Sequence, residues 1–572
     1  MKKEPFSNEC RRQLMVNNKK NFYVTLTTVF ADSLSNISIA FIFKYITEAM
    51  EKTDFSLLKK GISLALLTMA VSLTFNIIQK TYRNRYLKCG LSQFKKFVFN
   101  NILNKSVGEF GETSSAKFIS AFSNDLAQIE SNYLAANISL FYQSALLLGG
   151  VIAMAFINVK LMACVMAATL IPASVSMIYG KKMTAVEKQA SSKNEGFVDQ
   201  MKDLLNGFTV IKSFKAEKEV MSLFDNKNFE LEEVKRNRRE THDKVSIISA
   251  ISQVLVSIVL VCLGTYFVFR GDMTIGSVLA FIQLQNYTIG PVTRLVPLLV
   301  NRKAAAALIE KLAKAVEKSR QPLGAGVSVD SFEEGISLDN VSFAYESDKE
   351  TLRNVSLRFD KGKSYAIVGS SGSGKSTLLR LLLGHFRNYA GKVLFDRKEL
   401  RSLKEESLYD VLSVVQQNVF LFDSSLKNNI TMFKRFDERK YKKAVKLAGL
   451  QNLVVEKGDE YRCGEGGENL SGGEKQRVSI ARCLIRGTPV ILMDEATAAL
   501  DNSTAYSVTN SILDLKAMTK IIVTHKLDEK LMRKFDKIIA MKNGAVAESG
   551  GFEELMDRKG YFYSLYNISR TG

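Results

Sequence analysis

The first half of this chain contains six long apolar segments with few charges, and they restrict its fold more than any other feature. A helix needs about 20 apolar residues to cross a lipid bilayer, and each segment is close to or above that length. We therefore predict an all-α membrane domain of six transmembrane helices. The segments run over 22–46, 61–79, 134–157, 159–179, 247–269 and 276–300.

The connections between the segments indicate which side of the membrane each one faces. Short turns join the third segment to the fourth and the fifth to the sixth, whereas the connections after the second and the fourth are long and basic. Lys80 and Arg83 follow the second segment, and Lys181 and Lys182 follow the fourth. By the positive-inside rule these connections are cytoplasmic, and both chain termini then lie in the cytoplasm.

The net charge of +21, from 79 basic and 58 acidic residues, admits nucleic acid, an anionic membrane surface or a nucleotide as partner. Because the apolar residues concentrate in the first half, we expect membrane lipid and not nucleic acid. The basic runs are interpreted as solvated helix faces. The six cysteines form no CxxC pair, so neither a zinc site nor a disulfide framework is indicated.

The length of 572 residues predicts two or more domains. A cytoplasmic segment is expected over 1–20 and the membrane domain over 21–319. A linker with Pro and Gly at 320–326 leads to a domain over 327–572, in which short strands alternate with helices. That alternation is typical of a parallel α/β fold.

The two long cytoplasmic connections are compatible with helix, and each has a break near its middle. This pattern predicts two helical hairpins that extend from the membrane and are bent at their tips. Short crosswise helices are expected at these tips, at 113–121 and 206–214.

A glycine-rich loop in the α/β domain lies between an apolar strand at 365–368 and a helix that starts at Thr377. Its glycines let backbone amides approach phosphates at a helix N-terminus, Lys375 reaches the β- and γ-phosphates, and the Ser376 hydroxyl ligates Mg²⁺. The loop therefore predicts binding of ATP with Mg²⁺. It comprises Gly369, Ser370, Ser371, Gly372, Ser373, Gly374, Lys375 and Ser376.

A second apolar strand ends in two carboxylates, Asp494 and Glu495. We expect Asp494 to hold Mg²⁺ and Glu495 to polarise the attacking water. An acidic strand end that is merely capped is the weaker interpretation, because the phosphate-binding loop lies upstream. Gln417 and His525 lie on short loops after apolar runs, and taken alone each is interpreted as structural.

The segment Leu470-Ser471-Gly472-Gly473-Glu474 completes a resemblance that covers essentially the whole chain. The chain resembles an ATP-binding cassette (ABC) transporter of the exporter type, a half-transporter in which a membrane domain is fused to one nucleotide-binding domain. In that family this signature closes over the γ-phosphate of ATP held by the opposite subunit. The resemblance implies that two cassettes meet head to tail.

The same resemblance assigns roles to single residues. Tyr345 is similar to the aromatic residue that stacks on adenine, and Gln417 to the residue that senses Mg²⁺ and relays contact to the membrane domain. Asp501 is similar to the residue that communicates across the dimer, and His525 to the histidine that contacts the γ-phosphate. Glu465 falls in the family's segment before the signature, and the tips at 113–121 and 206–214 resemble its two coupling helices.

An intact glutamate and an intact signature favour a homodimer, and pairing with a separate, similar half-transporter stays open. The resemblance implies ATP hydrolysis coupled to alternating access in a bacterial plasma membrane. The expected cargo is a hydrophobic, amphipathic or cationic small molecule, a lipid or a peptide. Alternatives are an importer of a metal chelate, a cassette ATPase that regulates a partner or channel, and a soluble cassette ATPase acting on DNA or translation, against which the six segments argue.

Asp32 is the one acidic residue that we place well inside a predicted span. Such residues usually face a cavity or a partner. One hypothesis is that Asp32 lines the transport pathway and favours cationic cargo. The other is that it pairs with a basic or hydroxyl group of a neighbouring helix.

Overall fold

The computed structural model describes residues 6–111, 115–317, 326–329, 331–345 and 350–571. The chain divides into two compact units. A helical unit comprises Met1–Asn104 and Thr113–Glu317, and a cassette unit comprises Lys105–Glu112 and Lys318–Gly572. The predicted linker at 320–326, apart from Gly326, lies outside the described residues, as do residues 113 and 114 of the first predicted tip.

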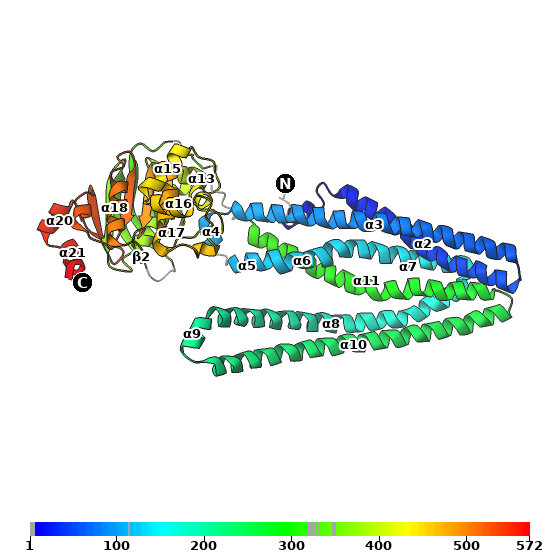
Figure 1. The fold of residues 1–572 in the computed structure, drawn as a ribbon. Coiled ribbons are helices and arrows are strands. Elements are labelled where there is room, and N and C mark those ends of the chain that lie inside the picture. The colour runs from blue at the N-terminus through cyan, green and yellow to red at the C-terminus, as the bar shows by residue number, and fades with distance from the viewer. Residues whose placement is uncertain (1–5, 112–114, 318–325, 330, 346–349, 572) are drawn as a thin grey trace. The chain divides into compact units, whose positions relative to one another are not determined.

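Every described element of the helical unit is a helix, and long helices lie side by side along it (Figure 1). The α-helices are α1 (Phe6–Gln13), α2 (Lys19–Glu51), α3 (Phe55–Leu103), α5 (Ser115–Ser120), α6 (Leu126–Ile129), α7 (Ala136–Ile157), α8 (Val159–Asn206), α9 (Phe208–Ser213), α10 (Glu217–Phe269) and α11 (Ile275–Val316). Two π-helical stretches, η1 (Ala121–Asp125) and η2 (Glu130–Ala135), interrupt the path from α5 to α7.

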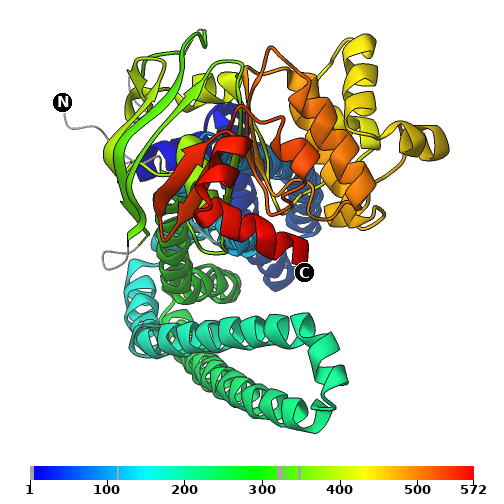
Figure 2. The same ribbon diagram turned by 90° about the vertical axis from the view of Figure 1, so that its left-hand side faces the viewer.

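Side-chain caps set where several of these helices begin. Asp54 accepts hydrogen bonds from the first backbone N–H groups of α3, Asn158 does so for α8 and Thr274 for α11. Such caps satisfy donors that have no partner within the helix. The α8–α10 hairpin, closed by α9 at its tip, diverges from the other long helices in both views (Figures 1 and 2).

Four helical stretches among the described residues are long and apolar enough to cross a membrane. They are Lys19–Glu51, Phe55–Leu103, Phe118–Ile157 and Glu217–Phe269. Large apolar side chains such as Leu66 and Met69 are 64% and 71% exposed on α3, as expected of a surface that faces lipid. The predicted fourth and sixth spans, in α8 and α11, are not among these four stretches, so the count of six spans stays a prediction.

The cassette unit contains two sheets. A four-stranded antiparallel sheet has the order β2-β1-β4-β5, and a six-stranded sheet has the order β10-β9-β3-β8-β7-β6. In the larger sheet all neighbours pair in parallel except β9 and β10. The strands are β1 (Gly335–Ala344), β2 (Glu350–Asp360), β3 (Ser364–Gly369), β4 (Ala390–Phe395), β5 (Lys398–Glu399), β6 (Leu412–Val415), β7 (Val490–Asp494), β8 (Thr519–Val523), β9 (Lys537–Lys542) and β10 (Ala545–Gly550).

Helices cover this larger sheet and connect its parallel strands, as a parallel arrangement requires. The α-helices of the unit are α4 (Val107–Gly111), α12 (Lys375–Leu382), α13 (Glu405–Val411), α14 (Leu426–Thr431), α15 (Glu438–Leu447), α16 (Gln451–Lys457), α17 (Gly472–Arg486), α18 (Asn502–Leu513), α19 (Glu529–Met532), α20 (Phe552–Arg558) and α21 (Tyr561–Thr571). Short 3-10 turns are η3 (Leu400–Ser402) and η4 (Glu465–Gly467).

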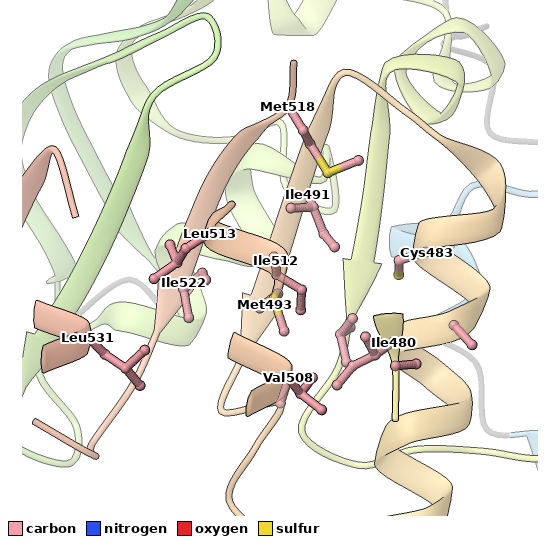
Figure 3. Packing of buried hydrophobic residues seen from close by; sticks show 14 of the residues in the cluster. Ile480, Cys483, Ile491, Met493, Val508, Ile512, Leu513, Met518, Ile522 and Leu531 are labelled. Atoms are coloured by element: carbon pink, nitrogen blue, oxygen red, sulfur yellow. The ribbon is translucent and has the colours of Figure 1, made fainter. Parts of the chain in front are cut away.

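One apolar core lies between the larger sheet and the helices α17 and α18 (Figure 3). Ile491 and Met493 of β7 and Ile522 of β8 point into it and pack near Ile480 and Ile512 of the two helices. These side chains are at most 6% exposed. The packing fixes the ends of β7 and β8, from which functional side chains extend. The predicted class, a helical membrane domain followed by an α/β domain, is confirmed.

Candidate nucleotide site

The site forms where four parallel strands end. The order β6-β7-β8-β3 brings the carboxyl ends of these strands to one edge of the sheet. The glycine-rich loop follows β3, Gln417 follows β6, Glu495 follows β7 and His525 follows β8. Ligands of open parallel sheets bind at this edge. The sheet topology therefore gathers side chains that are far apart in the sequence.

The glycine-rich loop adopts backbone conformations that favour glycine. Gly372 and Gly374 have φ values of 77° and 98°, in the left-handed region. The buried Lys375 folds over the loop, and its Nζ donates to the carbonyls of Gly369 at 3.0 Å and Ser370 at 2.8 Å. Burial lowers the pKa of Lys375, and Glu495 and Asp494 oppose that shift. The loop thus holds a cation beside the N-terminus of α12, which suits a phosphate group.

Ser376 and Asp494 present two oxygen ligands side by side. The Ser376 hydroxyl donates to Asp494 Oδ1 at 3.1 Å. Burial raises the pKa of Asp494, while the bond from Ser376 and the charges of Arg380 and Lys375 lower it. A hydroxyl and a carboxylate are ligands that Mg²⁺ accepts, and Mg²⁺ usually takes its remaining ligands from water and phosphate oxygens. The residues therefore fit Mg²⁺ bound together with a nucleotide.

Glu495 lies at the centre of the polar side chains. Its carboxylate accepts a hydrogen bond from Gln417 Nε2 at 2.9 Å, and its other oxygen lies 2.8 Å from His525 Nε2. The Glu495 backbone has a φ of 49°, which is uncommon for a residue other than glycine. Its N–H donates to the carbonyl of Val523 at 3.1 Å, which ties it to the end of β8. The structure thus brings three of the predicted site residues into direct contact.

Tyr345 lies at the opposite side of the loop. Its hydroxyl is 3.2 Å from the Thr377 hydroxyl, and its ring packs edge-on against Phe343 and Phe386. The residue is 51% exposed, so part of the ring is available to a flat ligand. A cavity of about 960 Å³ connects Tyr345 with Ser376 and Asp494. Its lining includes Tyr345, Ser376, Gln417, Asp494, His385 and residues of α4.

The signature residues lie elsewhere, at the start of α17. Ser471 accepts a hydrogen bond from the Glu474 N–H, and the Glu474 carboxylate accepts one from the Ser471 N–H at 2.7 Å. This reciprocal cap orders the helix start and leaves Gly472 and Gly473 in its first turn. None of the four residues lines the cavity described above. Asp501 caps α18 in a similar way, and the Ser503 hydroxyl and the Thr504 N–H hold its pKa well below the ordinary value.

Sequence reasoning missed residues that connect these loops. Gln476 Oε1 accepts from the Ala499 N–H at 3.0 Å, and Lys526 Nζ donates to the Leu500 carbonyl at 2.9 Å. Both contacts hold the loop that leads to Asp501. In the sequence, these two residues stand out only by position, because Gln476 lies close to the signature and Lys526 follows His525.

Within the cassette unit, the helix α4 packs beside the cavity. A Cβ atom on Gly108 would lie 2.5 Å from the backbone oxygen of His385, so the two backbones touch. The Val107 N–H donates to a carboxylate oxygen of Glu405 at 3.2 Å. Burial and the charge of Arg380 lower the pKa of His385. The residues of α4 precede the first predicted tip, 113–121, in the chain. The second predicted tip, 206–214, contains the helix α9.

Asp32 is buried in the helical unit and has three partners. Its Oδ1 accepts from Asn76 Nδ2 at 2.7 Å and from the Ser72 hydroxyl at 3.2 Å, both on α3. Its Oδ2 accepts from Asn36 Nδ2 at 3.3 Å. This geometry favours the hypothesis that Asp32 pairs with a neighbouring helix.

The helical unit and the cassette, with its phosphate loop and carboxylate pair, define an ATP-driven membrane transporter. Residues 22–292 match the family described as ABC transporter transmembrane region, and residues 352–498 match ABC transporter. The chain belongs to the ABC transporter family. It is therefore an integral membrane protein that binds ATP and couples ATP hydrolysis to transport.

Known relatives align with nearly the whole chain. The putative multidrug export ATP-binding/permease protein YgaD of Bacillus subtilis is 28% identical, over 96% of this chain and 97% of its own length. A protein of Staphylococcus aureus with the same description is 28% identical over 84% of each chain. The solved structure of a bacterial Atm1-family ABC exporter with ATP bound matches with a TM-score of 0.85 at 20% identity, over 96% of this chain and 99% of that one. This last likeness concerns the fold.

Proposed function

We propose that the protein is a homodimeric exporter in a bacterial plasma membrane. Its cargo is a hydrophobic, amphipathic or cationic small molecule, a lipid or a peptide. The direction is supported by the relatives described as multidrug export proteins. We also propose that the chain crosses the membrane six times and that its cassette lies in the cytoplasm. The basic connections between the apolar segments support this orientation.

The observation that carries the proposal is the contact of Glu495 with Gln417 and His525 beside the Ser376–Asp494 pair. In the proposed reaction, Ser376 and Asp494 hold Mg²⁺, which neutralises charge on the β- and γ-phosphates. Glu495 orients the attacking water and accepts its proton. Lys375 releases the loop carbonyls and donates to the phosphates instead.

The signature supports a head-to-tail dimer. Ser471 and Glu474 cap a helix whose N-terminus favours anions, yet they do not line the cavity beside their own Asp494. A second copy in head-to-tail orientation would bring that helix start to the γ-phosphate. Closure then depends on ATP, because a ligand shifts a conformational equilibrium only by binding one state more tightly.

Inside-out membrane vesicles test the direction and the coupling together. ATP added outside such vesicles reaches only cassettes that faced the cytoplasm. We expect ATP-dependent accumulation of ethidium, a cationic amphipathic dye, in vesicles with the natural protein and none with Glu495→Gln. ATP-dependent loss of preloaded dye would instead indicate an importer. Hydrolysis without movement of any dye, lipid or peptide tested would indicate a regulatory ATPase.

A further inference from the structure

A cavity in the helical unit is lined by three cationic side chains and is distinct from the nucleotide site. Its volume is about 370 Å³, and it lies between α1, η2 and α11. The lining residues are Arg11, Tyr133, Leu299, Arg302, Lys303 and Ala306.

The three cations have no acidic partner among the described residues. No carboxylate of the described chain lies within ion-pair distance of Arg11, Arg302 or Lys303, although 23 such pairs occur elsewhere. The Nε of Arg11 is buried and has no hydrogen-bond acceptor in the described part of the chain. A buried donor without an acceptor is costly, which points to an acceptor supplied by another molecule.

Arg302 is held in place rather than neutralised. Its Nε donates to Asn137 Oδ1 at 2.6 Å, and its guanidinium lies 5.6 Å from the centre of the Tyr133 ring. The amide and the ring are uncharged, so the positive charge of Arg302 stays uncompensated. Its terminal nitrogens make no hydrogen bond to another residue of the described ranges.

The helix that carries Arg11 is fixed against its neighbours. Cys10 and Leu14 are fully buried in the core that α1 shares with α3 and α11. A Cβ atom on Gly90 would lie 2.9 Å from the carbonyl oxygen of Leu14, the residue that follows α1, so the end of this segment lies close to α3. The buried Asn18 donates to the Tyr86 carbonyl at 2.8 Å. The cavity is therefore built before any ligand arrives.

Tyr133 directly precedes the predicted span 134–157, and Arg302 and Lys303 follow the predicted span 276–300. On the proposed orientation, the cavity lies at the cytoplasmic boundary of the bilayer, where anionic headgroups collect and basic pockets bind them. Leu299, which is 52% exposed, adds an apolar surface beside the charges. This combination suits a phosphate group that is attached to an acyl chain.

We propose that Arg11, Arg302 and Lys303 form a binding site for a phosphate-bearing anion, supplied by an anionic phospholipid or by free phosphate. Binding of the anion at this site stabilises the helical unit, whichever cargo is transported. Its test therefore needs no turnover, and its failure would leave the proposed export function untouched.

The test follows the melting temperature of the full-length protein in detergent micelles containing phosphatidylcholine. Circular dichroism is the suitable signal, because the chain has no tryptophan. Short-chain phosphatidylglycerol is titrated in one arm, inorganic phosphate in a second, and phosphatidylcholine of equal chain length in a third. We expect phosphatidylglycerol to raise the melting temperature and the neutral lipid to leave it unchanged. Stabilisation by inorganic phosphate as well would identify free phosphate as a sufficient ligand.

The variant Arg11→Gln/Lys303→Gln removes the two cations that have no other described partner. We expect its apparent affinity for the anion to fall about thirtyfold, as the loss of two nearby charges implies. Arg12→Gln is the matched control, because Arg12 is exposed on the same helix and does not line the cavity. Arg11→Lys, which keeps the charge, is expected to retain most of the binding.

An equal loss in Arg12→Gln, or no loss in the double variant, would overturn the proposal. No stabilisation by either anion in the natural protein would do the same. If the double variant does not fold, Lys303→Gln alone decides the question, since this side chain is exposed and makes no described contact that folding requires.

Discussion

Glu495 is positioned by contacts that come from other strands. Its left-handed backbone conformation aims the carboxylate at Gln417 and His525, and a hydrogen bond to Val523 holds it there. Conformations of this kind are retained when the surrounding structure enforces them.

We predict that Glu495→Gln binds ATP normally but hydrolyses it about 10² to 10⁴ times more slowly, because an amide cannot accept the proton of the attacking water. ATPase assays and equilibrium ATP binding on the purified protein check both parts. The control is Lys375→Ala, which is expected to lose ATP binding itself. Substantial residual hydrolysis in Glu495→Gln would remove this residue from the role of base.

Asp32 provides a second prediction at this scale. In Asp32→Asn one oxygen becomes an amide group that cannot accept from Asn36, so we expect a loss of about 1–2 kcal/mol of stability. Thermal unfolding measures that loss, and dye transport below the melting temperature should continue. A normal melting temperature with abolished transport of the cationic dye would instead place Asp32 in the transport pathway.

Among the single elements, the short helix α4 lies beside the nucleotide site. It has five residues, too few to be stable alone, and it is held by backbone contact with His385 and a hydrogen bond to Glu405. Residues of α4 line the same cavity as Gln417, and α4 follows α3 in the chain, so we propose that it passes changes at the nucleotide site on to the membrane helices.

We predict that Gly108→Ala separates hydrolysis from transport, because the new methyl group would displace α4 from His385. Basal ATPase activity should stay within about twofold of the natural protein, since no catalytic contact changes. Dye accumulation in inside-out vesicles should fall several-fold. Gly111→Ala is the matched control, since a Cβ atom there would meet nothing within 4 Å. Equal effects of the two substitutions would argue against this role of α4.

At the scale of the whole molecule, the proposed head-to-tail dimer predicts complementation between two inactive variants. Lys375→Ala disables the phosphate loop, and Ser471→Ala disables the signature, so each variant alone should be inactive. A mixed dimer has one site made of the intact loop of one subunit and the intact signature of the other.

Co-expression in equal amounts makes half of the dimers mixed, and purification through two different tags isolates these. Each has one of its two sites intact, so about half of the natural ATPase activity per dimer should return. The measurement is ATPase activity of dimers purified through two different tags. Mixtures of Lys375→Ala with Glu495→Gln serve as the control, because those two changes affect the same half of a site and restore nothing. No recovery in the first mixture would contradict the proposed dimer geometry.

Several parts of the site were predictable because they are local in the sequence. The glycine-rich loop and the Asp494–Glu495 pair need only one strand and the turn after it, so their spacing reveals them. The contacts of Glu495 were not predictable from the residues alone, because Gln417 and Val523 reach it from other strands. Asp32 shows the same limit, since Ser72 and Asn76 pair with it only when α2 and α3 pack.

The helical membrane domain and the α/β cassette follow from the amino-acid sequence, because hydropathy and strand-loop-helix motifs depend on neighbouring residues. The same local motifs predict the chemistry of the phosphate loop and of the carboxylate pair. Three contacts could be seen only in the folded chain. The helix α4 touches His385, Asp32 accepts hydrogen bonds from α3, and Arg11 and Arg302 line one cavity. Such contacts join residues far apart in the chain, and close packing of whole helices and sheets selects them.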